Sequence, residues 1–90
     1  MLKNLEDLIK TIRDRKNSSS DQSYTNKLLK DKNLIVSKVK EEINELIEAV
    51  EKNTNKIHES ADVLYHLLVY LEANDIKIED VMNELVKRKK

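Results

Sequence analysis

The sequence has 90 residues with 17 basic and 17 acidic side chains, and it lacks glycine, proline and cysteine. The absence of cysteine excludes disulfides, thiolate nucleophiles and zinc–thiolate sites. The balanced charge argues against nucleic acid or an anionic membrane as a partner. The longest apolar run, Val63 to Leu71, is too short to span a bilayer. We therefore expect a cytoplasmic protein.

Helices are the expected secondary structure, because tight turns between strands usually need glycine. A first helix is predicted from Leu2 to about Arg15, where apolar residues recur at helical spacing: Leu2, Leu5, Leu8, Ile9 and Ile12. The polar stretch from Lys16 to Ser23 predicts a mobile surface loop. A short helix can follow from Tyr24 to Lys30.

Helical spacing of apolar residues continues through the second half of the chain. It predicts a long helix from Asn33 to Lys52 and another from about Asn55 to Ala73, with a break and an N-cap at Asn53–Thr54. After a turn at Asn74–Asp75, a last helix is defined by Ile78, Val81, Met82, Leu85 and Val86. The predicted fold class is all-α, a single domain over residues 1–90 built as a bundle of four to five helices.

The segment from Val63 to Leu71 carries apolar side chains nearly all the way round its predicted helix. A helix of this kind is normally buried, yet a chain of this length builds only a thin core. We therefore expect a homodimer, in which a second copy completes the bundle and covers the apolar surface that one chain leaves exposed.

Two acidic pairs lie on neighbouring predicted helices. Glu42 and Glu45 border the apolar stripe of one helix, and Glu59 and Asp62 lie on the largely apolar helix that follows. The members of each pair are three residues apart and so share a helix face. An antiparallel hairpin of the two helices can bring the four carboxylates together, where their mutual repulsion requires a cation. Oxygen ligands without sulfur select Mg²⁺, with Mn²⁺ as a further possibility.

The alternative is a solvated helix face, in which lysines one turn away neutralise the acids. We prefer that interpretation for Glu48 and Glu51, but Glu59 and Asp62 lie on an apolar helix, where unpaired charge is costly. His66 falls on the same strip of that helix. A core histidine that is hydrogen-bonded to a neighbour explains it better than a metal ligand does, although it could also orient a ligand from behind.

The spacing Glu42-x-x-Glu45 followed by Glu59-x-x-Asp62 resembles the metal signature of the MazG-like all-α nucleoside triphosphate pyrophosphohydrolases. This resemblance assigns the four carboxylates as metal ligands and the bundle as MazG-like.

Three segments are more specifically similar to the phosphoribosyl-ATP pyrophosphohydrolase family. They are Ser-Tyr-Thr-Asn-Lys-Leu at residues 23–28, Lys-Val-Lys-Glu-Glu at 38–42 and Ala-Asp-Val-Leu-Tyr-His-Leu-Leu-Val at 61–69. The similarity covers nearly the whole chain in order. Lys40 stands where the family usually has glycine. Because the chain has no glycine at all, we expect the loop before the second long helix to be built differently and the fit of the substrate to differ there.

The family resemblance implies a function. It implies hydrolysis of phosphoribosyl-ATP to phosphoribosyl-AMP and pyrophosphate, the second step of histidine biosynthesis, by a magnesium-dependent dimer. Water would attack the triphosphate between its α and β groups. We expect one carboxylate that is not fully committed to metal, Glu41 or Glu45, to take the proton from that water as general base.

Basic and hydroxyl side chains are the expected ligands of the substrate phosphates: Arg13, Arg15, Lys16, Ser23, Tyr24, Thr25, Lys27 and Lys38. For the basic cluster from Arg13 to Lys16, compensation of a helix dipole is an equally good explanation. For Ser23 to Thr25 the alternative is helix capping, which can coexist with phosphate binding at a helix N-terminus.

Two other functions stay open. A MazG-like enzyme that removes noncanonical or surplus nucleoside triphosphates would use the same four carboxylates, although the Ser-Tyr-Thr segment argues against it. A non-enzymatic helical interaction module would fit the high charge, but it leaves Glu59 and Asp62 on an apolar helix unexplained.

Overall fold

A computed structural model describes residues 2–17 and 23–89 of the chain. Five helices follow one another, and no strand occurs in these ranges: α1 Leu2–Lys16, α2 Tyr24–Lys30, α3 Lys32–Lys52, α4 Lys56–Ala73 and α5 Ile78–Lys87. The predicted all-α fold class is therefore confirmed. The loop predicted between Lys16 and Ser23 lies mostly outside the described residues, and Lys16 itself ends α1.

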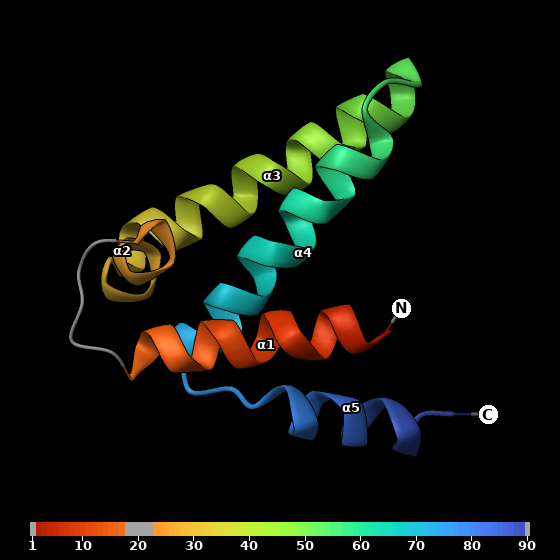
Figure 1. Ribbon diagram of the computed structural model, residues 1–90. Helices are drawn as coiled ribbons and strands as arrows, with labels where there is room; N and C mark the ends of the chain where they lie inside the picture. Colours follow the sequence, from red (N-terminus) through yellow and green to blue (C-terminus); the bar gives the residue numbers. More distant parts are fainter. Residues whose placement is uncertain (1, 18–22, 90) are drawn as a thin grey trace.

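Helices α3 and α4 form the long antiparallel hairpin of Figure 1. The turn between them uses left-handed backbone at Asn53, with φ of 55°, and at Asn55, with φ of 45°. Asparagine is among the few residues other than glycine that adopt this conformation readily, which is how a chain without glycine turns here. The predicted N-cap at Asn53–Thr54 is wrong, because Asn55 takes the N-cap position and its side chain makes no capping hydrogen bond.

The core lies where α1, α2 and α3 meet the second half of α4. Its buried members come from four helices: Ile12, Leu28, Ile35, Leu68 and Val69. Because the core is this small, one side of the hairpin stays uncovered. Leu64 and Leu67 are 46% and 38% exposed, and Ile47 on α3 is 51% exposed. The apolar segment of α4 is thus buried on one face only within a single chain.

Helix α5 lies at the periphery, next to α1 in Figure 1. Ile78 at its start packs against the core, whereas Met82, Leu85 and Val86 remain exposed. No helix in residues 2–17 and 23–89 has the length and apolar character that crossing a membrane requires.

Candidate active site

Carboxylates from α3 and α4 converge on the inner side of the hairpin. Glu42, Glu45 and Glu59 each offer an oxygen that lies within 4.8 Å of those of the other two. Asp62 lies one turn after Glu59. With His58, these two residues form a second group, in which one ligand atom of each residue lies within 4.8 Å of those of the other two. The antiparallel hairpin therefore brings together the two acidic pairs that the sequence analysis singled out.

These carboxylates are short of partners. Glu42 is only 5% exposed, and its Oε2 is buried with no hydrogen-bond partner among the described residues. The Oε2 atom of Glu59 is in the same condition. Burial raises the pKa of Glu42, and the nearby charges of Glu45 and Asp62 raise it further. The pKa of Glu59 is likewise raised, first by desolvation and then by Glu45.

One side chain supplies positive charge at the edge of this group. The Lys38 ammonium is 2.9 Å from Oε2 of Glu41 and 3.5 Å from Oε1 of Glu42. Its hydrogen bond to Glu41 raises the pKa of Lys38, which therefore stays protonated at neutral pH. A single ammonium shared between Glu41 and Glu42 leaves a net negative charge, so the donor set fits a divalent cation that prefers oxygen ligands.

His66 supports the site from behind. Its Nδ1–H donates to the backbone carbonyl of Asp62 at 2.7 Å, so in the neutral ring Nε2 accepts from the hydroxyl of Tyr24 at 3.0 Å. Tyr24 stacks on Tyr65, whose hydroxyl is hydrogen-bonded to Thr25. These bonds tie α2 to α4 beside the carboxylates. His66 is buried with both ring nitrogens satisfied, as expected for a core histidine.

Comparison with known proteins agrees with this arrangement. A model of the family described as phosphoribosyl-ATP pyrophosphohydrolase matches residues 5–89. The chain belongs to that family. The resemblance that the sequence analysis found in residues 23–28, 38–42 and 61–69 is therefore confirmed.

Individual relatives give the same result. A phosphoribosyl-ATP pyrophosphatase of Clostridium novyi is 46% identical over 90 residues, which cover 96% of this chain and 81% of the relative. That of Clostridium acetobutylicum is 47% identical over 88 residues, covering 93% and 79%. The histidine biosynthesis bifunctional protein HisIE of Pyrococcus furiosus is 47% identical over 91 residues, covering 100% of this chain but 42% of the longer relative.

The segment of residues 23–28 acts structurally in this member of the phosphoribosyl-ATP pyrophosphohydrolase family. Ser23 is the N-cap of α2, and its Oγ accepts from the backbone N–H of Asn26 at 3.0 Å. Asn26 is 1% exposed and donates through Nδ2 to the carbonyl of Arg15 at 2.8 Å, which joins α2 to the end of α1. The capping alternative for Ser23 is thus confirmed, whereas its contact with phosphate stays a prediction.

Two of the predicted phosphate ligands lie elsewhere in the chain's fold. Arg13 forms a two-pronged hydrogen bond with Glu79 and lies 3.6 Å from Glu72. Lys16 donates to the carbonyl of Glu72 at 2.8 Å and pairs with Asp75. Glu72 is ten residues beyond Asp62, about 15 Å along α4. Arg13 and Lys16 therefore join α1 to the far end of α4 and to α5. Arg15 is exposed and lies in the last turn of α1.

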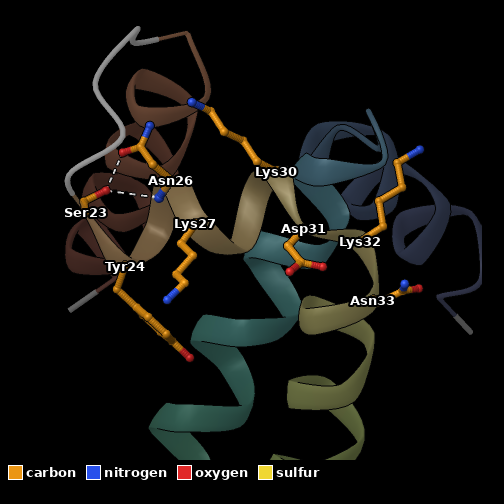
Figure 2. Close-up of a pocket in the computed structure, with 8 residues that line it drawn as sticks. All are labelled: Ser23, Tyr24, Asn26, Lys27, Lys30, Asp31, Lys32 and Asn33. Carbon is orange, nitrogen blue, oxygen red and sulfur yellow. Dashed lines mark hydrogen bonds between the residues drawn. The ribbon is translucent and has the colours of Figure 1, made fainter.

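A second basic surface follows α2. An open pocket of about 970 Å³ is lined by Ser23, Tyr24, Asn26, Lys27, Lys30, Asp31, Lys32 and Asn33. Figure 2 shows Tyr24 and Lys27 extending in the same direction from α2, toward α4, while Lys30 and Lys32 project away from it. Of the lysines that line the pocket, Lys27 is thus the one that extends on the same side of α2 as Tyr24, which is hydrogen-bonded to His66.

Sequence reasoning missed several residues of this region. Asn26 carries no periodic signal, since a buried asparagine looks like any other polar residue of a short helix. His58 was not among the predicted site residues, and its spacing of four from Asp62, which places the two on one helix face, is the signal that could have identified it. Lys30 and Lys32 line the pocket but were not among the predicted ligands. They lie on either side of Asp31, whose Oδ1 accepts from the Leu34 N–H at 3.0 Å and caps α3.

Proposed function

We propose that this chain hydrolyses phosphoribosyl-ATP to phosphoribosyl-AMP and pyrophosphate with the help of Mg²⁺, as a step of histidine biosynthesis. The observation that carries the proposal is the group of carboxylates between α3 and α4, whose buried oxygens Glu42 Oε2 and Glu59 Oε2 have no partner among residues 2–17 and 23–89. Membership of the phosphoribosyl-ATP pyrophosphohydrolase family, over residues 5–89, supplies the substrate. We also expect the enzyme to act in the cytoplasm.

Glu42, Glu45, Glu59 and Asp62 are the proposed metal ligands. Their oxygens are the donors that Mg²⁺ prefers, and Mn²⁺ would bind the same set. When bound, the ion neutralises charge on the phosphate oxygens and makes the phosphorus more electrophilic. The four side chains come from two helices that pack against each other along the hairpin, which positions them together for a charged substrate.

The proton of the attacking water goes to Glu41 or Glu45 in this proposal. Glu41 is exposed and paired with Lys38 at 2.9 Å. Glu45 offers an oxygen within 4.8 Å of ligand atoms of the buried Glu42 and of Glu59. Glu45 is therefore placed among the residues that would hold the metal, where it could accept a proton from water, and Glu41 is placed to orient Lys38. Separate exchange of each for glutamine distinguishes the two roles by the pH profile of kcat.

Phosphate binding is assigned first to Lys38 and Lys27. Lys38 lies against Glu41 and Glu42, so its ammonium would be within reach of a phosphate that binds beside these acids. Lys27 lines the pocket beside α2 together with Ser23 and Tyr24. The hydroxyls of Tyr24 and Thr25 are hydrogen-bonded to His66 and Tyr65, so these two residues would contact phosphate only by exchanging those bonds. Arg13, Arg15 and Lys16 are more distant within one chain, and reach substrate only if a second copy presents them.

A homodimer is the proposed assembly. The exposed apolar side chains of the hairpin come from both of its helices and include Ile43, Ile47, Val50, Leu64 and Leu67. Such a surface is larger than the isolated apolar residues that monomers commonly expose. A second copy packed on it would complete a four-helix bundle around α3 and α4. Sedimentation equilibrium tests this expectation, and a stable monomer would contradict it.

The central test is pyrophosphate release from phosphoribosyl-ATP in the presence of Mg²⁺. Exchange of Glu42 or Asp62 for the corresponding amide should abolish release while circular dichroism shows an unchanged helix content. Glu48→Gln is the matched control, because Glu48 is an exposed acid of the same helix that pairs with Lys52. Retained turnover in Glu42→Gln would refute the metal assignment. Faster release from other nucleoside triphosphates would instead favour the nucleotide-removing function.

A further inference from the structure

His58 lies beside the carboxylates but belongs to neither acidic pair. Its Nε2 is 3.3 Å from Oδ2 of Asp62, four residues further along α4. One ligand atom each of His58, Glu59 and Asp62 lie within 4.8 Å of one another. This group shares Glu59 with the group of Glu42, Glu45 and Glu59. The imidazole therefore extends the same row of donor atoms toward the turn that joins α3 to α4.

An ordinary ion pair on a helix surface explains the His58 contact with Asp62, but it does not explain the neighbouring atoms. The Glu42 side chain is 7% exposed, and its Oε2 has no partner among the described residues. Burial raises the pKa of Glu42, and the charges of Glu45 and Asp62 raise it further. Glu59 Oε2 is a second buried oxygen without a partner in the described part of the chain. Both unpartnered oxygens belong to the group of Glu42, Glu45 and Glu59, and the Glu59 carboxylate is shared with the group of His58 and Asp62. Buried oxygens without partners indicate a cation, and the shared Glu59 places His58 and Asp62 next to it.

The other histidine cannot take this part. Both ring nitrogens of His66 are used, by the carbonyl of Asp62 at 2.7 Å and by the hydroxyl of Tyr24 at 3.0 Å. The side chain of His58, by contrast, is 72% exposed, so its ring can turn toward an ion with no cost in packing. His58 is therefore the one imidazole of the two in this chain with a nitrogen available to a metal at this site.

We propose that His58 is a nitrogen ligand of the cation held by Glu59 and Asp62, and that it shifts the site's preference from Mg²⁺ toward first-row transition-metal ions such as Mn²⁺. Imidazole binds transition-metal ions well, whereas Mg²⁺ favours an all-oxygen shell. The inference rests on the metal site of the proposed function and adds one donor to it.

Electron spin-echo modulation of bound Mn²⁺ tests the inference directly, because a coordinated imidazole couples its ¹⁴N nucleus to the manganese spin. The untagged chain loaded with Mn²⁺ should show this nitrogen modulation, and His58→Gln should lose it. His66 remains in that variant as an internal control. Ser60→Ala, an exposed change on the same turn of α4, should retain the signal.

Calorimetric titrations of Mn²⁺ and Mg²⁺ supply the second readout. His58→Gln should weaken Mn²⁺ binding by about tenfold or more and Mg²⁺ binding by less than about threefold. Because His58 is exposed, the substitution leaves the core untouched and both titrations can be made on folded protein.

The outcomes separate this inference from the proposed function. Manganese that binds without nitrogen modulation, or modulation that persists in His58→Gln, overturns the role of His58 while the carboxylate site stands. Equal loss of Mn²⁺ and Mg²⁺ affinity in His58→Gln also overturns it, because a nitrogen ligand discriminates between the two ions. If neither ion binds the unchanged chain and Glu42→Gln releases pyrophosphate normally, the metal site itself is refuted.

Discussion

The acidic side chains at the two ends of α4 have different partners. Near its C-terminus, Glu72 meets Arg13 of α1 at 3.6 Å, and the Lys16 ammonium bonds its backbone carbonyl. Near its N-terminus, Glu59 and Asp62 face the acids of α3, where Lys38 is the cation that the structure places against Glu42. Acids with cationic partners join helices together, whereas acids gathered without enough cations form a site that needs an ion.

Mutation of an acid should therefore reduce activity at the N-terminal end of α4 and stability at its C-terminal end. Glu59→Gln should lower kcat/KM for pyrophosphate release by about 100-fold or more, since it removes a proposed metal ligand. Glu72→Gln, at the other end of the same helix, should leave turnover largely unchanged and lower stability instead. Steady-state kinetics and thermal melts of both variants check this contrast. Equal activity losses would show that the two ends do not differ in function.

Metal addition should stabilise the carboxylate end. At a free Mg²⁺ concentration of about 100 times its dissociation constant, binding to the folded state alone adds about 2.7 kcal/mol. For a domain of this size the melting temperature then rises by about 10 °C or more. Glu42→Gln should respond much less, and a chelator should reverse the shift. An unchanged melting temperature in the wild-type chain at saturating Mg²⁺ argues against the site.

Without metal, Glu42 should lower the stability of the fold at neutral pH. Its pKa is raised in the folded state, mainly by burial, so the folded chain binds more protons than the unfolded chain between about pH 4.5 and that raised value. Stability from this group is therefore present at low pH and lost as pH rises. Metal-free Glu42→Gln should be more stable than wild type at pH 7 by about 1 kcal/mol.

Urea unfolding in a chelating buffer measures that difference at two pH values. The two proteins should converge below about pH 4.5, where Glu42 is protonated in both states. A Glu42→Gln variant that is less stable at pH 7 would mean that its contact with Lys38 outweighs the repulsion from Glu45 and Asp62.

The ion-paired end should show the opposite pH dependence, with a smaller effect because its groups are exposed. The Arg13 hydrogen bond lowers the pKa of Glu79 from 4.5 to about 2. The folded state therefore binds fewer protons than the unfolded state, and the stabilisation present above pH 4.5 is lost as pH falls toward 2. Glu79→Gln should flatten the decline of the melting temperature in this range relative to wild type. Parallel declines would show that the pair contributes nothing measurable.

Sequence periodicity predicted the helices well, because it depends on contacts within one or two turns. Helix α2 coincides with the predicted Tyr24–Lys30, and α4 begins one residue after the predicted start at Asn55. The acidic pairs were found for the same reason, since a spacing of three places two side chains on one face wherever the helix lies. Their convergence required only that the two helices fold back on each other.

The basic residues were harder to assign. Arg13 and Lys16 lie 66 and 59 residues from Glu79 and Asp75, the acids that they bond, so no local pattern links them. The burial of Asn26 depends on a carbonyl of α1 eleven residues away. The exposure of Leu64 also depends on tertiary structure, because a helix that is apolar all round does not reveal which face the rest of the chain covers.

The sequence alone determined the helical fold class, the helix faces and the two acidic pairs, because each follows from side chains a few residues apart. The folded chain determined which of those charges are neutralised. Whether an acid meets a lysine, an arginine or another acid depends on how helices distant in sequence cross, and that crossing left Glu72 paired and Glu42 with an unpartnered oxygen among the described residues.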